Sequence, residues 1–321
     1  MAGPAEILIA RDKGFLSLGA IDRSGGWRSK ESTLSPGATS RSRSEPAAGG
    51  RPEVGAPPLD SERALWGLGT EVCCAAMPCR LLEFLYCNLA SIKSIRQFVQ
   101  TFKTKKLPLH VLVNNAGVMM VPQRTTDDGF EEHFGINYLG HFLLTNLLLD
   151  TLRESGAPGR GARVVTVSSA THYVGELNLD DLQSSASYSA HAAYAQSKLA
   201  LVLFTYHLQA LLAAQGSPVT ANVADPGVVD TDLYRHVFWG TRLVKKLLGW
   251  WVFKTPDEGA WTSVYAAVAP ALEGLGGRYL YNERETRSLE ATYDPELQRQ
   301  LWARSCQLTG IADVTRETFG E

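Results

Sequence analysis

The stretch that decides the fold is RVVTVSSATHYVGELNLDDLQSSASYSAHAAYAQSK, residues 163–198. It opens with an apolar, β-branched run that ends in Ser168 and Ser169, a pattern that predicts a buried strand. It closes with Tyr194 and Lys198, four residues apart at the start of an alanine-rich apolar segment. A helix places two side chains with this spacing on one face, one turn apart.

Tyr194 and Lys198 together indicate acid–base chemistry. A free phenol has a pKa of about 10, and a neighbouring ammonium favours the phenolate, so Lys198 is expected to lower the pKa of Tyr194. A hydroxyl at the end of a strand, such as that of Ser169, can hold the oxygen that the tyrosine protonates or deprotonates. His172 could line the substrate pocket, but we assign it no role as a base because Tyr194 fills that role. The stretch predicts a site that interconverts a carbonyl and an alcohol.

Composition and charge narrow the class of protein. The chain has 321 residues, 45% hydrophobic and 20% charged, which suffices for one α/β domain of roughly 250 residues with an extension or for two small domains. The formal net charge of −2 gives no reason to expect nucleic acid as a partner. Cys73, Cys74 and Cys79 lie close together without a nearby histidine, so neither a disulfide framework nor a metal site is predicted.

The N-terminal quarter differs in composition from the rest. Residues 25–58 are rich in Ser, Arg, Gly, Pro and Ala, and such a segment cannot bury enough apolar surface to offset its ordering entropy. We therefore expect residues 1–80 to be a mostly disordered, low-complexity arm and residues 81–316 to form the domain. Two short apolar pieces, residues 6–10 and 15–21, are the places where isolated turns of structure could form.

From residue 81 onward, apolar strand-like runs alternate with segments of helical period. The expected strands are residues 81–89, 109–113, 163–167, 219–224 and 278–281. The expected helices start at Ser91, cover residues 127–152, run through Tyr194 to about Gln215, and follow Pro256. This alternation predicts βαβ units and a Rossmann-like, doubly wound parallel sheet covered on both faces.

Several motifs occur in a characteristic order: Asn114-Asn115-Ala116-Gly117, Asn137, Ser169, Tyr194-x-x-x-Lys198 and Pro226-Gly227. In this combination the chain resembles the short-chain dehydrogenase/reductase family over residues 82–311. The segments 84–87, 136–142 and 224–229 are most similar to its retinol-dehydrogenase-like branch. That resemblance implies a lipophilic alcohol as substrate, such as a retinoid or a polyprenol- or dolichol-like isoprenoid, and its aldehyde or ketone as product.

The resemblance also implies catalytic roles. Tyr194 would be the general acid/base, and Lys198 would lower its pKa and bind the nicotinamide ribose. Ser169 would orient the substrate oxygen, whereas Ser168 would be structural. The amide of Asn137 would link Lys198 to a proton-relay water.

A nicotinamide dinucleotide, NAD or NADP, is the cofactor that the resemblance implies. Its contacts would be Asn88, Asn115, Ala116, Gly117, Lys198, Pro226, Gly227 and Thr231. Asn88 stands where the family usually has an aspartate that contacts the adenine. Gly117 would let the backbone approach the ribose closely, and Thr231 would bond the nicotinamide carboxamide.

The family's first βαβ unit, with its glycine-rich pyrophosphate-binding turn, has no counterpart in the sequence. The nearest glycine clusters, Gly25-Gly26 and Gly67-Leu68-Gly69, are not expected to follow a strand or open a helix at the required spacing. The fold is therefore expected to be truncated of this unit, leaving an unpaired strand edge. We predict that the chain binds NAD(P) poorly or is unstable, and the NAD or NADP preference stays open.

Residues 234–254 combine apolar and basic side chains. This pattern is typical of a substrate-binding lid whose apolar face touches a membrane or lipid droplet, although a helix packed on the core is the alternative. The segment is too mixed to span a bilayer. The resemblance implies the endoplasmic reticulum membrane or lipid droplets as location, or the cytoplasm if the N-terminal segment replaces an anchor, and it is compatible with a homodimer.

Two kinds of function remain open from the sequence. The complete set of Asn137, Ser169, Tyr194 and Lys198 favours an active oxidoreductase. The missing glycine turn favours a catalytically impaired form that serves as a lipid- or protein-binding remnant. Docking of the arginine-containing N-terminal arm to a partner is a weaker third hypothesis.

Overall fold

The computed structural model describes residues 5–10, 15–20, 82–229 and 254–313. The packing of the chain divides it into two units, one of residues 22–79 and one of residues 1–21 with 80–321. All described residues belong to the second unit, so the fold below is that of this unit alone. Thr231 and all but the last residue of the segment 234–254 lie outside the described residues.

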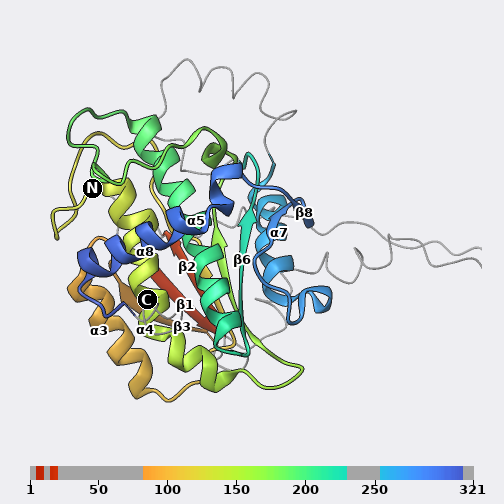
Figure 1. The fold of residues 1–321 in the computed structure, drawn as a ribbon. Helices are drawn as coiled ribbons and strands as arrows, with labels where there is room; N and C mark the ends of the chain where they lie inside the picture. The colour runs from red at the N-terminus through yellow and green to blue at the C-terminus, as the bar shows by residue number, and fades with distance from the viewer. Residues whose placement is uncertain (1–4, 11–14, 21–81, 230–253, 314–321) are drawn as a thin grey trace, which may run out of the picture. The chain divides into compact units, whose positions relative to one another are not determined.

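Among the described residues, eight strands form one sheet in the order β3-β1-β2-β4-β5-β6-β7-β8 (Figure 1). They are β1 (Ala5–Ala10), β2 (Phe15–Ala20), β3 (Leu82–Cys87), β4 (Val111–Asn114), β5 (Ala162–Val167), β6 (Val219–Asp225), β7 (Tyr279–Tyr281) and β8 (Arg284–Thr286). Neighbouring strands from β2 to β7 are parallel, whereas β1 and β8 run antiparallel to theirs. The predicted α/β class with a largely parallel sheet is confirmed.

The N-terminal strands are the second and third of this sheet, between β3 and β4. β1 and β2 pair antiparallel, with Ala10 opposite Phe15, and β2 lies parallel to β4, with Leu18 opposite Asn114. The two short apolar pieces of the N-terminal segment 1–80, where isolated turns were expected, are thus strands. The rest of that segment lies outside the described residues. The expected unpaired strand edge is not found at β4. There β2 pairs with β4, so the backbone N–H and C=O groups on that side of β4 are hydrogen-bonded.

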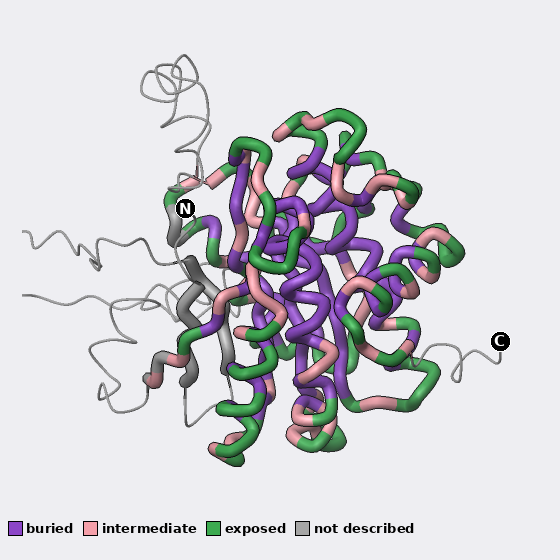
Figure 2. The backbone as a smooth tube through the Cα atoms, turned by 90° about the vertical axis from the view of Figure 1, so that its left-hand side faces the viewer, coloured by how far each residue is buried: buried purple, intermediate pink, exposed green. Residues whose placement is uncertain are grey.

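Helices cover both faces of the sheet (Figure 1), and the buried residues gather in the interior with exposed residues around them (Figure 2). The helices are α3 (Ile92–Thr104), α4 (Gly140–Ser155), α5 (Ala190–Ala214), α7 (Pro256–Val268) and α8 (Pro295–Thr309). Side chains alternate along a strand, so Leu112 and Val164 join the core under α3, α4 and α5, whereas Val113 and Val165 join the core under α7.

The helix predicted over residues 127–152 starts later than expected and is not uniform. A π-helical segment, η2 (Phe134–Leu139), precedes α4. Glu131 explains the late start, because its carboxylate accepts hydrogen bonds from the backbone N–H groups of His133 at 2.9 Å and Phe134 at 2.7 Å. An acceptor that satisfies the first free N–H groups marks the start of a helix.

β8 and α8 were not predicted, although the sequence carries a signal for α8. Asp294 accepts from the N–H groups of Glu296 and Leu297 at its start, Pro295 is its first residue, and Gly310 closes it in the left-handed conformation with φ of 64°. These are favoured residues at helix ends. α5 is long and apolar enough to cross a membrane, but 78% of its apolar window is buried, as in the core helix of a globular protein.

Candidate active site

Tyr194 and Lys198 lie one turn apart near the start of α5, which Ser189 caps by accepting a hydrogen bond from the N–H of Ala192. Both side chains are buried, with 3% of Tyr194 and 6% of Lys198 exposed. Lys198 Nζ lies 5.7 Å from the centre of the Tyr194 ring and donates a hydrogen bond of 3.1 Å to the carbonyl of Val167. The pair therefore sits at the carboxyl end of β5.

Two opposing effects set the pKa of Lys198 and thereby its charge. Burial lowers the pKa of Lys198 to about 8, and the carboxylate of Asp225 acts in the other direction. With a pKa of about 8, most Lys198 side chains remain protonated at neutral pH. A positive charge beside a phenol favours the phenolate, so this placement suits Tyr194 to acid–base chemistry.

The two serines after β5 have different surroundings. Ser168 is buried and donates a hydrogen bond of 2.9 Å from its hydroxyl to the main-chain carbonyl of Lys198, which is a structural contact. Ser169 is half-buried and begins the short helix η3 (Ala170–Val174), where its Oγ accepts from the N–H of Thr171 at 3.3 Å. Its O–H can therefore still donate to a substrate oxygen.

His172 is fully buried beside Ser169, which corrects the expectation that it lines the substrate pocket. Its Nδ1 lies 2.8 Å from the carbonyl of Ser169, and its Nε2 lies 3.2 Å from the backbone nitrogen of Leu289. Because an amide N–H only donates, Nε2 accepts and the proton is assigned to Nδ1. Burial lowers the pKa of His172, so a neutral ring holds the backbone of Ser169.

Asn137 clamps the loop that follows β4. Its Oδ1 accepts from the N–H of Val118 at 2.7 Å, and its Nδ2 donates to the carbonyl of Val118 and to Oγ of Ser197, each at 3.0 Å. The main-chain carbonyl of Asn137 is bonded to His141 Nδ1 at 2.8 Å. Both side-chain N–H groups are thus engaged, and the contact with a relay water stays a prediction.

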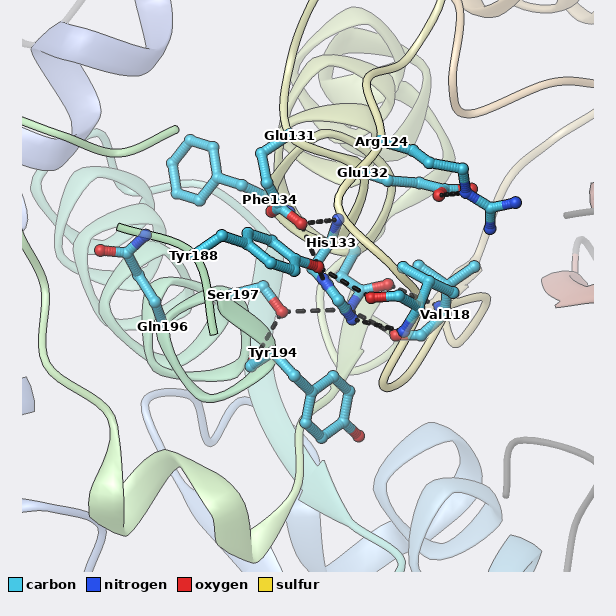
Figure 3. A network of polar contacts seen from close by, with 12 residues as sticks. Val118, Arg124, Glu131, Glu132, His133, Phe134, Tyr188, Tyr194, Gln196 and Ser197 are labelled. Atoms are coloured by element: carbon cyan, nitrogen blue, oxygen red, sulfur yellow. Dashed lines mark hydrogen bonds and ion pairs between the residues drawn. The ribbon is translucent and has the colours of Figure 1, made fainter. Parts of the chain in front are cut away.

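Figure 3 shows a second clamp on the same loop. The N–H of Val121 donates to His133 Nε2 at 3.3 Å, and the hydroxyl of Tyr188 donates to the carbonyl of Val121 at 2.8 Å. His133 Nδ1 lies 2.7 Å from Glu131 Oε1, so its proton points at the carboxylate. The His133 ring meets the Tyr194 ring edge-on at 6.0 Å, while the Tyr194 hydroxyl points away from this network.

The two clamps hold a backbone conformation that would otherwise be unfavourable. Met120 lies between the clamped residues Val118 and Val121 and has a φ of 53°, which few non-glycine residues adopt. Sequence reasoning did not find the second clamp, because His133 and Tyr188 reach Val121 from 12 and 67 residues away. No local pattern connects residues at such separations.

The predicted cofactor contacts after β4 lie at the carboxyl edge of the sheet, where ligands bind in folds of this kind. Asn115 is exposed and Ala116 is buried. A Cβ atom on Gly117 would lie 3.0 Å from Asn137 Oδ1 and 4.0 Å from Lys198 Nζ, so its absence keeps space open above the lysine. Asn88, after β3, is half-buried and accepts a hydrogen bond of 3.0 Å from the N–H of Ala90.

The turn after β6 contains Pro226 and Gly227. Gly227 has a φ of 75°, which favours glycine, and its N–H donates to Asp225 Oδ1 at 2.8 Å. The turn is thereby fixed at the same edge of the sheet as Gly117. Thr231, the predicted contact of the carboxamide, is outside the described residues.

A nicotinamide dinucleotide fits this edge in part. The open space above Gly117, the donor on Lys198 and the turn at Gly227 suit the ribose and nicotinamide half. In the part of the chain that the structure describes, no glycine-rich turn opens a helix to receive the pyrophosphate. Gly25-Gly26 and Gly67-Leu68-Gly69 both lie outside the described residues.

His207 and Asp181 have local roles. His207 packs its ring on Trp302 at 5.0 Å, and burial lowers the pKa of His207 to about 4. Asp181 accepts hydrogen bonds from the N–H groups of Ser185 and Ala186 in an exposed loop. No group of three His, Cys, Asp or Glu side chains that could hold a metal ion occurs in the described residues.

The site combines a buried phenol, an ammonium one helical turn away, a serine hydroxyl at the neighbouring strand end and open space at Gly117. This combination defines an oxidoreductase that interconverts a carbonyl and an alcohol. The model of the short chain dehydrogenase family matches residues 79–239. The chain belongs to this family.

The chain is also similar to individual proteins of this family and to a solved structure. Human polyprenol dehydrogenase is 79% identical over 234 residues, which cover 73% of this chain and 71% of that protein. Mouse retinol dehydrogenase 14 is 46% identical over 226 residues, 70% of this chain and 66% of that protein. A solved structure of an uncharacterized protein from Mycobacterium Paratuberculosis is 36% identical with a TM-score of 0.55, and the match covers 70% of this chain and 74% of that chain.

Proposed function

We propose that this chain is an NAD(P)-dependent oxidoreductase that interconverts a lipophilic alcohol of the polyprenol or retinoid class and its aldehyde or ketone. The observation that carries the proposal is the buried pair of Tyr194 and Lys198, with Nζ 5.7 Å from the ring centre, next to the strand that ends before Ser169. The names of the relatives, polyprenol dehydrogenase and retinol dehydrogenase, support the class of alcohol.

Each residue has one part in the proposed reaction. The Tyr194 hydroxyl exchanges a proton with the substrate oxygen, and the Lys198 charge stabilises the phenolate when that proton has left. The Ser169 hydroxyl donates a hydrogen bond to the same oxygen and orients it. NAD(P), when bound, supplies or accepts the hydride. Lys198 and the backbone at Gly117 would hold its ribose.

A binding module without catalytic activity is the second candidate. The observation that favours it is that β1 and β2, which lie between β3 and β4, pair antiparallel and are separated by only four residues, too few for the helical crossover of a βαβ unit. A βαβ unit would place a helix N-terminus at the cofactor edge, where it attracts a phosphate. In this second interpretation the chain still binds a lipophilic alcohol, but no hydride is transferred.

Titration of the purified full chain with NADH and NADPH should show binding weaker than micromolar, because the described residues offer only the nicotinamide half of a dinucleotide site. Cofactor fluorescence is the measurement, and human polyprenol dehydrogenase titrated alongside is the control. Micromolar binding of either dinucleotide would show that this prediction is wrong.

Turnover separates the two candidates. The chain is incubated with a polyprenol or retinol and millimolar NAD⁺ or NADP⁺, and the aldehyde is quantified by mass spectrometry. Formation of aldehyde supports the oxidoreductase. Binding of the alcohol without aldehyde, at cofactor concentrations that saturate the chain, supports the binding module.

The lid and membrane contact expected for residues 234–254 are part of the proposal and rest on the sequence of that segment alone. Replacing Trp250 and Trp251 by serine should reduce flotation of the chain with liposomes, because interfacial tryptophans contribute apolar area and amphipathic anchoring. Flotation of wild type and variant on neutral and anionic liposomes is the measurement. Identical flotation of both proteins would remove the membrane contact and the proposed endoplasmic reticulum or lipid-droplet location.

A further inference from the structure

Asp225 is a buried carboxylate at the end of β6, and both its oxygens are held. Oδ1 accepts from the N–H of Gly227 at 2.8 Å, and Oδ2 accepts from the hydroxyl of Tyr279 at 2.7 Å. Only 1% of the residue is exposed. A buried carboxylate is costly unless it is hydrogen-bonded and faces a positive charge. Two neutral donors satisfy its hydrogen bonds, and a positive charge should lie nearby.

Lys198 is that charge, and the sheet register brings it close. Val167 is paired with Ala224 across β5 and β6, and Lys198 Nζ donates to the carbonyl of Val167 at 3.1 Å. Asp225 is the next residue on β6. Since Val223 packs against α5 and strand side chains alternate, Asp225 points to the same helix face that carries Lys198.

The other titratable groups around Lys198 do not supply a negative charge at neutral pH. His141 on α4 is fully buried, and burial together with the Lys198 charge lowers the pKa of His141 to about 4. Tyr194 lies on the same helix and is the group that the lysine assists in the proposed reaction. On β7, burial and the charge of Asp225 raise the pKa of Tyr279, so its hydroxyl stays protonated and remains a donor.

We propose that Asp225 is a positioning residue that keeps the Lys198 ammonium charged beside Tyr194. This role of Asp225 rests on the proposed function only in that Lys198 assists Tyr194 in the reaction. The same carboxylate is connected to Ser169 through Tyr279 and His172. Their rings lie 4.8 Å apart, Tyr279 Oη lies 3.3 Å from His172 Nδ1, and that nitrogen lies 2.8 Å from the carbonyl of Ser169.

Asp225→Asn tests the charge with little other change. The amide that replaces the carboxylate could accept the Gly227 N–H with its oxygen and donate from its nitrogen to Tyr279, whose hydroxyl can also accept. The titration of Lys198 is followed in the full chain by NMR of ¹³C- and ¹⁵N-labelled lysine, with the signal assigned from Lys198→Arg. The pKa of Lys198, about 8 in the wild type, should fall by about one unit or more, as expected for loss of a nearby charge in a partly shielded site.

A matched control removes a carboxylate elsewhere. Asp150→Asn takes one negative charge from α4, where 75% of the side chain is exposed and water screens it. This variant should leave the Lys198 titration unchanged. An unchanged titration in Asp225→Asn, or an equal shift in both variants, would overturn the proposal.

A second measurement covers the case in which Asp225→Asn folds poorly. In a double-mutant cycle with Lys198→Met, read from urea unfolding, Asp225→Asn should destabilise the chain more in the presence of Lys198 than in its absence. If Asp225→Asn lowers the stability equally with and without Lys198, or prevents folding in both cases, Asp225 only stabilises the turn before Gly227. Either result would overturn the proposal.

These readouts do not need turnover. If the wild-type chain oxidises no alcohol, the proposed function fails, while the Lys198 titration still decides the role of Asp225. If the chain is active, Asp225→Asn should also move the limb of the pH–kcat profile that belongs to Lys198 toward lower pH, in step with the NMR titration.

Discussion

Tyr194→Phe should lower the turnover of a lipophilic alcohol by about a hundred- to ten-thousand-fold, the range that a general acid/base contributes. The ring keeps its packing, including the edge-on contact with His133 at 6.0 Å, so the fold should not change. The loss comes from the hydroxyl, which points away from the buried network of Figure 3. The measurements are kcat at saturating cofactor and the far-UV circular dichroism spectrum.

Tyr86→Phe is the matched control for this variant. Tyr86 lies on β3 with 61% of its surface exposed, and the same hydroxyl is removed there without touching the site. Its turnover should equal that of the wild type. A Tyr194→Phe enzyme within tenfold of wild type would show that another group handles the proton.

Trp302→Ala should reduce the free energy of unfolding by about 3–5 kcal/mol, the usual cost of removing a large aromatic side chain from a core. Trp302 lies on α8, is 2% exposed, and packs on Phe142 of α4 at 5.0 Å and on Phe204 of α5 at 5.9 Å. These contacts attach the C-terminal helix to the two helices that carry much of the core. Urea unfolding followed by circular dichroism is the measurement.

Trp302→Phe provides the comparison. Among the described residues the buried indole Nε1 has no hydrogen-bond partner, so phenylalanine loses apolar contact but removes an unsatisfied donor at the same time. Its destabilisation should be clearly smaller than that of alanine. A loss below about 1 kcal/mol for Trp302→Ala, the size of an ordinary substitution, would show that α8 contributes little to the stability of the domain.

The sequence predicted the parts of the fold that depend on local periodicity. The strand ending at Val167 and the helix carrying Tyr194 follow from residues that are neighbours in the chain, and both are present with nearly the predicted bounds. The predicted start of the helix over residues 127–152 was wrong. The Glu131 side chain accepts the first hydrogen bonds of this helix, and the periodicity of apolar residues does not indicate that position.

The position of the N-terminal strands could not be predicted in the same way. Residues 5–10 and 15–20 have apolar character and pair with each other, but two strands alone are marginally stable and do not predict a place in a larger sheet. They are strands because β3 and β4 offer hydrogen-bonding edges on either side. Those edges belong to residues roughly a hundred positions away for β4, and pairing over such distances is a property of the folded chain.

What the sequence by itself determined is the pairing of Tyr194 with Lys198, because the turn of a helix sets the distance between residues four apart regardless of the rest of the protein. What only the tertiary structure decided is the environment of that pair. Asp225 faces Lys198 because β5 and β6 lie side by side in one register. Burial then removes the water that would otherwise screen the charge, and so gives a distant carboxylate influence over the lysine.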